Sequence, residues 1–196
     1  MARAALSTEA VVDIALRLID EGTGGAGGTD SGPAALTLSE VAARAGVRTP
    51  SLYKHVRGLA ELRDLVSARI MNEMADEVGA AVLGRSSDEA VRALMTAWRA
   101  YARRHPHRYA ALVQRPEPGT AEAGARLVAI MLATLRAYGL EDSAAIHAAR
   151  CLRAVVHGFA ALETGGAFEL PEKLDDTYDL LVHMVVSGLH TPRETD

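Results

Sequence analysis

The sequence predicts an all-α protein in which a group of short helices is followed by several longer amphipathic helices. Hydrophobic residues make up 49% of the 196 residues and aromatic residues only 4%. Alanine and leucine, both strong helix formers, are abundant. Apolar residues recur at helical spacing, and no run of alternating β-branched residues indicates a strand. A chain of this length suits one or two small domains.

The first helix is expected to begin after Ser7, which can serve as its N-cap. Leu6 and Val11 are placed to form a hydrophobic staple around this cap. The apolar stripe of the helix has the i, i+3, i+4, i+7 spacing of a core-facing surface and consists of Val11, Ile14, Ala15, Leu18 and Ile19. The glycine-rich stretch from Gly22 to Ala35 is interpreted as a flexible linker.

Residues 37–57 carry the clearest local pattern in the chain. Thr37 and Glu40 have the spacing of a capping box, which starts a short helix. Gly46 ends this helix where a residue with positive φ is needed. Thr49 is a candidate N-cap for a second helix that reaches about His55, with Pro50 at its first position. Two short helices joined by a tight glycine turn predict a helix-turn-helix.

The outward side of the second helix carries donors and cations with almost no competing acid, which suits phosphate oxygens and base edges. The net charge of −4 does not oppose this reading, because the stretch from Arg44 to Arg69 has six basic residues and only two acidic ones. An ordinary helical hairpin with a solvated charged face is the alternative. The residues expected to contact double-stranded DNA are Thr37, Ser39, Arg48, Thr49, Pro50, Ser51, Tyr53, Lys54 and His55.

With the motif ARAGVRTPSLYKHV the chain resembles the TetR family of transcriptional regulators, in which a short helix, the residues AGV and an LYxH-type recognition helix follow one another. Leu59 departs from the family, which usually has a phosphate-binding lysine there, so Arg57 or Lys54 would have to serve instead. The loop before Thr37 is also longer than usual. Further on, VVHGFAALETGGAFELPE resembles a group of TetR regulatory domains named for a Trp-His-Gly motif, although Val156 replaces the tryptophan.

Helices are expected over residues 59–83, 91–104, 106–113, 120–138 and 142–164, followed by a last helix that starts at Pro171. The helix over 59–83 is amphipathic and would connect the DNA-binding part to the rest. The segment from Arg99 to Arg115 has five arginines and no acid. A second DNA contact is conceivable there, but a solvated or acid-paired surface is favoured.

The resemblance implies an N-terminal three-helix DNA-binding domain, residues 1–60 including the loop 22–35, and a C-terminal helical bundle for ligand binding and dimerisation, residues 61–196. A two-fold dimer would read two half-sites of a palindromic operator roughly 34 Å apart. A final helix that merely packs on its own core is the alternative. The predicted interface residues are Val155, Leu162, Tyr178, Leu181, Val182, Val185, Val186 and Leu189.

The resemblance also implies a pocket for a small apolar or amphipathic effector between bundle helices. The residues proposed around it are Met95, Trp98, Tyr101, Tyr109, Leu112, Met131, Leu135, His157 and Phe159. Apolar residues at helical spacing are more often plain core. His157 is interpreted as a hydrogen-bonded interface residue, with ligand binding or proton sensing as alternatives.

The favoured function is a homodimeric repressor that an effector releases from its operator, and an activator or a ligandless regulator is the alternative. A small helical enzyme is disfavoured, because no catalytic residues and no spaced metal-ligand set are recognised. No cofactor is expected. The lone cysteine, Cys151, is expected to be a buried inert thiol, with redox sensing as the alternative. Without a signal peptide or an apolar run long enough for a bilayer, we expect a cytoplasmic protein that does not use a membrane.

Overall fold

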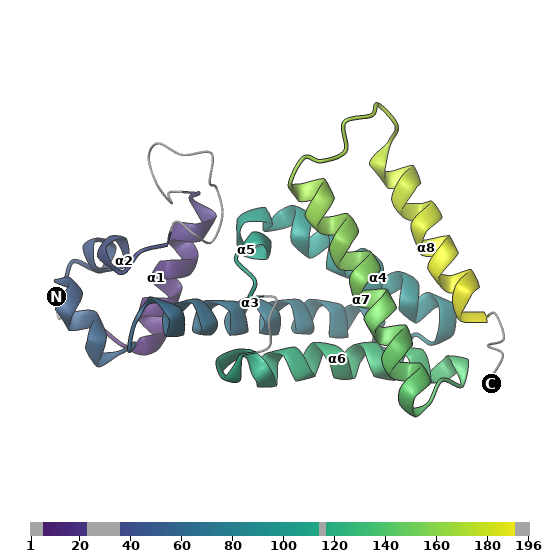
Figure 1. The fold of residues 1–196 in the computed structure, drawn as a ribbon, viewed down its shortest axis with the longest axis horizontal. Helices are drawn as coiled ribbons and strands as arrows, with labels where there is room; N and C mark the ends of the chain where they lie inside the picture. Colours follow the sequence, from purple (N-terminus) through teal and green to yellow (C-terminus); the bar gives the residue numbers. More distant parts are fainter. Residues whose placement is uncertain (1–5, 23–35, 114–116, 191–196) are drawn as a thin grey trace. The chain divides into compact units, whose positions relative to one another are not determined.

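A computed structural model describes residues 6–22, 36–113 and 117–190. Within these ranges the secondary structure is helical and contains no strand, so the all-α prediction is confirmed (Figure 1). The residues form two compact units. Unit 1 comprises Met1–Asn72 and His105–Gly124, and unit 2 comprises Glu73–Arg104 and Ala125–Asp196.

Unit 1 begins with α1, Thr8–Asp20, for which Ser7 is the N-cap as predicted. The side chain of Ser7 accepts a hydrogen bond from the backbone N–H of Ala10. The residues of the predicted apolar stripe are buried except Ile19, which is half-buried. Most of the predicted linker, residues 23–35, lies outside the described residues.

Helix α2, Leu38–Ala45, has the predicted capping box. The hydroxyl of Thr37 accepts from the N–H of Glu40 at 3.2 Å, and the Glu40 carboxylate accepts from the N–H of Thr37 at 3.2 Å. The helix ends at Gly46, whose φ of 66° lies in the left-handed region. The N–H of Val47 then donates to the carbonyl of Ala42 at 3.0 Å, which closes the turn.

The second helix of the motif is a 3-10 helix, η2, Thr49–Lys54, rather than an α-helix. The prediction that Thr49 caps it was wrong: Arg48 is the N-cap, no side chain caps the helix, and Thr49 is its first residue. Proline fits the first turn because the N–H that it lacks would have no partner there. Leu52 is fully buried and anchors η2 against the rest of the unit.

Residues 105–124 belong to unit 1 through contacts that the sequence does not reveal. Helix α5, Pro106–Ala110, carries Arg108, which makes a bidentate ion pair with Asp20 at 2.6 and 2.7 Å. The N–H of Val113 donates to the hydroxyl of Ser67. The compact units therefore differ from the predicted domain boundary at residue 60. Helix α5 is also shorter than the helix expected over 106–113, and η3, Pro118–Thr120, follows it.

Helix α3, Leu59–Val82, contributes to both units. Five of its buried residues recur every four positions: Leu62, Val66 and Ile70 lie in unit 1, and Met74 and Val78 lie in unit 2. This is the spacing of one helical face, so a single apolar stripe supplies two cores.

In unit 2, helix α4, Ser87–Arg104, packs against α7, Asp142–Thr164, and α8, Leu174–His190. Helix α6, Ala121–Leu135, is followed by η4, Arg136–Tyr138, and by Gly139 with φ of 66°. The bounds of α7 confirm the predicted helix over 142–164. The start predicted for the last helix was wrong: it begins at Leu174, where Asp175 and Asp176 occupy a first turn that favours acids, and Pro171 lies in the preceding connection.

A buried cation joins α4, α7 and α8. The side chain of Arg99 is 9% exposed and binds Glu163 through two hydrogen bonds of 2.6 and 2.8 Å. Asp175 lies 2.8 Å from the same guanidinium, and the rings of Phe159 and Tyr178 face it at 5.2 and 4.6 Å. The Glu163 hydrogen bonds hold the pKa of Arg99 above its usual range. The arginine is thus fully neutralised where it is desolvated.

A second polar cluster joins the start of α4 to η4 and to the end of α8. One carboxylate oxygen of Asp88 accepts from the hydroxyl of Tyr138 at 2.8 Å and lies 2.7 Å from Nε2 of His190. The Tyr138 and His190 hydrogen bonds hold the pKa of Asp88 below its usual value. Burial and the Asp88 hydrogen bond raise the pKa of Tyr138 to about 12.

The arginines of the segment from Arg99 to Arg115 are largely paired with acids, as favoured from the sequence. Arg99, Arg104 and Arg108 bind Glu163, Glu77 and Asp20 respectively. Arg115 lies outside the described residues.

Among the described helices, none by itself has the length and hydropathy of a membrane span. The pair Pro118–Tyr138 and Asp142–Thr164 would pass that test only together, and the two helices meet at 116°.

We expect Gly46→Ala to lower the free energy of unfolding by about 1–2 kcal/mol, because a side chain in the left-handed region is strained. Urea denaturation followed by circular dichroism measures this. Gly124→Ala in α6 is the matched control, since no atom lies within 4 Å of the added Cβ, and there the substitution should stabilise by about 0.5–1 kcal/mol. Equal effects of the two changes would contradict the role of the turn.

We expect Glu163→Ala to destabilise the protein by about 3 kcal/mol, because it leaves the Arg99 charge buried with less compensation. The same denaturation experiment measures it. Glu77→Ala removes the partner of Arg104 from an exposed ion pair and should cost less than about 1 kcal/mol. A loss at Glu163 no larger than at Glu77 would show that the Arg99 cluster does not hold the three helices.

Candidate DNA-binding surface

The residues predicted to contact DNA lie on α2, η2 and the turn between them. Tyr53 is 57% exposed although it is a large aromatic residue. Exposed with it are Thr37, Ser39, Arg48, Pro50 and Lys54, and half-buried are Thr49, Ser51 and His55. The hydroxyl of Thr8 donates to the carbonyl of His55 at 3.0 Å, so the end of η2 is tied to α1. The helix-turn-helix thus presents aliphatic hydroxyls, the phenol of Tyr53 and the cations of Arg48 and Lys54 to solvent.

Fewer basic side chains are available for DNA near η2 than the sequence indicates, because some of them are paired with acids. Arg44 forms a bidentate pair with Glu21 of the α1 C-cap at 2.5 and 2.7 Å, and Arg69 lies 3.1 Å from Asp13 and 3.5 Å from Glu9. These two arginines hold α2 and α3 against α1. The cations that remain near η2 are Arg48 and Lys54, together with Arg57, which contacts Glu61.

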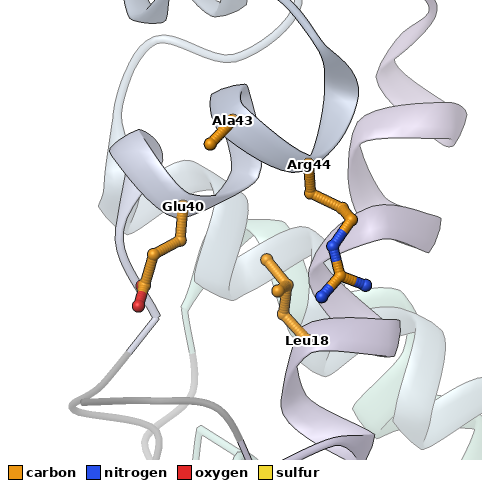
Figure 2. A pocket seen from close by; sticks show the side chains of 4 residues that line it. All are labelled: Leu18, Glu40, Ala43 and Arg44. Carbon is orange, nitrogen blue, oxygen red and sulfur yellow. The ribbon is translucent and has the colours of Figure 1, made fainter. Parts of the chain in front are cut away.

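A shallow hollow of about 440 Å³ lies beside α1 and α2 (Figure 2). Its lining side chains are Leu18, Glu40, Ala43 and Arg44. Glu40 serves the capping box and Arg44 the pair with Glu21, so both charged groups of the lining have structural partners.

The residues predicted to bind an effector are divided between the two compact units. Tyr109 and Leu112 belong to unit 1, whereas the other seven belong to unit 2. Of those seven, His157 is half-buried, and burial together with Arg153 lowers its pKa. No predicted effector residue lines the hollow beside α1 and α2 or a second hollow between α7 and α8. The buried ones are Met95, Trp98, Tyr101, Met131, Leu135 and Phe159.

The residues predicted for a dimer interface fall into two sets. Tyr178, Val182 and Val186 are buried inside the chain, and the hydroxyl of Tyr178 donates to the carbonyl of Met95 at 2.6 Å. These three need no second chain to cover them. The remaining five are half-buried or exposed on α7 and α8: Val155, Leu162, Leu181, Val185 and Leu189.

A hollow of about 220 Å³ lies between α7 and α8 and contains residues that the sequence analysis missed. Cys151 lines it and is exposed, so the expectation of a buried thiol was wrong. Its neighbours Leu152 and Val156 are buried. Helical phase could have revealed this, because a residue one position before a buried leucine points about 100° away from it. The full lining is Ala148, Cys151, Leu152, Val155, Met184, Val185, Gly188 and Leu189.

Within the described residues, no group of three or more His, Cys, Asp and Glu side chains is placed to hold a metal ion.

Comparison with known proteins agrees with this geometry. Residues 91–185 match the model of a family described as a tetracyclin repressor-like C-terminal domain. An HTH-type transcriptional regulator of Mycobacterium tuberculosis is 34% identical over 170 residues, which are 85% of this chain and 74% of that protein. An HTH-type transcriptional regulator of Bacillus subtilis is 30% identical over 190 residues, which are 95% of this chain and 94% of that protein.

Solved structures share the fold, and two of them are TetR proteins bound to small molecules. A TetR variant from Acinetobacter baumannii in complex with minocycline has a TM-score of 0.69 and 19% identity, over 94% of this chain and 96% of that one. The TetR family protein ActR of Streptomyces coelicolor in complex with (S)-DNPA has a TM-score of 0.68 and 20% identity, over 95% and 98%. From the helix-turn-helix, the regulatory-domain match and the two relatives, we conclude that the chain belongs to the TetR family of DNA-binding transcriptional regulators and is not an enzyme.

Proposed function

We propose that this regulator is a repressor that binds a palindromic operator as a homodimer and leaves it when a small apolar or amphipathic effector binds. The observation that carries the proposal is the exposed side of η2, where donors and cations stand on a helix fixed by the Gly46 turn. Phosphate contacts of such groups give affinity and base-edge contacts give specificity. The site of action would be the cytoplasm, where the operator DNA is.

The roles proposed on η2 follow from residue type and exposure. Arg48 stands at the N-cap of η2 with an exposed side chain, and Thr49 follows it. We assign these two to base edges, because arginine pairs bidentately with guanine. Tyr53, Lys54 and His55, near the other end of the helix, are assigned to phosphates.

The proposed dimer surface is the exposed apolar side of α7 and α8. Met184, which lines the 220 Å³ hollow, is 62% exposed, and Leu180 of α8 and Leu162 of α7 are 59% and 48% exposed. Large exposed apolar side chains that gather on one side of a protein mark interaction surfaces. Charged residues are absent from the lining of the hollow.

Two glycines within these helices support the same surface. A Cβ added at Gly158 or at Gly188 would meet no atom within 4 Å. Neither glycine is therefore explained by packing inside the chain, although each destabilises its helix by about 1 kcal/mol relative to alanine. Close approach of a helix from a second copy would use the space that a side chain would otherwise fill.

The effector is proposed to bind among the buried apolar residues of unit 2, the set that includes Trp98 and Met131. The minocycline and (S)-DNPA complexes are complexes of other TetR-fold proteins and support this only by analogy of fold. Whatever the effector, linkage requires that it prefer the DNA-free conformation, and that operator DNA weaken effector binding by the same factor.

Selection of bound duplexes from a random library tests the DNA-binding proposal. We expect an enriched inverted repeat whose half-site centres lie about 34 Å apart, with affinity that falls steeply as salt rises. Arg48→Ala should relax the preference at one position in each half-site, whereas Lys54→Ala should weaken all duplexes to a similar extent. Enrichment of a single half-site, or of none, would contradict the symmetric operator.

Met184→Asp tests the dimer surface. We expect this variant to be monomeric by sedimentation and to bind the selected operator at least tenfold more weakly, because the aspartate would be desolvated in the interface. Leu83→Asp is the matched control, since Leu83 is 80% exposed at the end of α3 and lies outside the proposed surface. A Met184→Asp protein that remains dimeric would place the interface elsewhere.

A further inference from the structure

The connection between η2 and α3 holds an exposed arginine in a defined orientation. Arg57 lies two residues before α3, and its side chain is 89% exposed. The Glu61 carboxylate accepts from the backbone N–H of Arg57 at 2.5 Å and from Nε at 3.1 Å, and it lies 3.1 Å from Nη2. One carboxylate therefore fixes both the backbone and the side chain of the same arginine.

An exposed arginine gains little stability from one surface ion pair, so stability alone does not explain this arrangement. The geometry leaves part of the guanidinium available. Glu61 lies against the edge formed by Nε and Nη2, and the edge formed by Nη1 and the second hydrogen of Nη2 still has its donors. That edge matches two oxygens of a phosphate in a bidentate contact.

We propose that Arg57 is a further DNA-phosphate contact and that Glu61 is the residue that positions it. The proposal rests on the DNA binding proposed above. Arg57 follows Lys54 and His55 of the proposed phosphate-binding end of η2 by three and two residues, so it extends the same surface. It also stands at the start of a 24-residue helix, where the helix dipole favours an anion.

Removal of the Glu61 carboxylate tests the proposal, because simple repulsion and positioning of Arg57 predict opposite changes in DNA affinity. Hydrogen bonding from the Arg57 backbone holds the pKa of Glu61 below its usual range, so the carboxylate carries its charge at neutral pH. A negative charge beside DNA repels phosphate, and its removal alone would strengthen binding. If Glu61 instead orients Arg57, its removal weakens binding, because the guanidinium must be ordered when DNA binds.

The experiment measures binding of the full-length protein to the selected operator by fluorescence anisotropy at several salt concentrations. We expect Arg57→Ala to weaken binding about three- to tenfold and to reduce the slope of log K against log salt by about 0.9, the value for one phosphate contact. Glu61→Ala should also weaken binding, by about threefold. In the Arg57→Ala background, Glu61→Ala should cause no further loss.

Three controls make the outcome specific. Glu77→Ala removes an equal charge from an arginine pair in unit 2 and should leave operator affinity unchanged. Glu61→Gln keeps an oxygen that can accept from the Arg57 N–H and should retain part of the affinity. Circular dichroism and sedimentation confirm that each variant is folded and has the oligomeric state of the wild type.

Stronger operator binding by Glu61→Ala, or an unchanged salt slope for Arg57→Ala, overturns the inference while wild-type DNA binding stands. Failure of the wild type to bind any duplex instead overturns the proposed function itself.

Discussion

The turn at Gly46 links the local sequence to the surface that we propose to read DNA. The φ of 66° at Gly46 ends α2 and changes the direction of the chain. The N–H of Val47 then donates a hydrogen bond to the carbonyl of Ala42. Ala42 is itself buried and small, so η2 can approach α2 closely with Leu52 as its anchor. The exposure of Tyr53 and Lys54 follows from that anchor, because they come directly after Leu52 on the helix. A DNA reader needs such rigidity, because its contacts lose specificity when the helix that carries them is loosely held.

In unit 2 a buried cation has the comparable role. Arg99 receives carboxylates from α7 and α8 and lies between two aromatic rings, so the first turn of α8 has a fixed place against α4. This arrangement turns Tyr178, Val182 and Val186 inward and leaves Leu180 and Met184 outside. One side of α8 thus belongs to the core of the chain, and the opposite side forms part of the exposed apolar surface. The Arg99 ion cluster holds α8 in the orientation that separates the two sides.

Much of this could be predicted from the sequence because caps and glycine turns act locally. Thr37, Glu40 and Gly46 predicted their helix ends correctly. Thr49 misled because threonine is a favoured N-cap residue, whereas the actual N-cap, Arg48, makes no side-chain capping hydrogen bond. Long-range pairs such as Arg108 with Asp20 leave no local pattern, so the grouping of residues 105–124 with the N-terminal helices could not be foreseen. For the same reason, helical spacing shows that Tyr109 is buried but not in which compact unit it lies.

The single cysteine gives the native sequence a useful property. Cys151 is the one thiol in 196 residues, and it is exposed beside the apolar hollow of α7 and α8. A fluorophore or spin label therefore attaches at one defined point per chain without any engineered substitution. A second chain over this hollow would shield the thiol, so its alkylation rate would follow the monomer concentration.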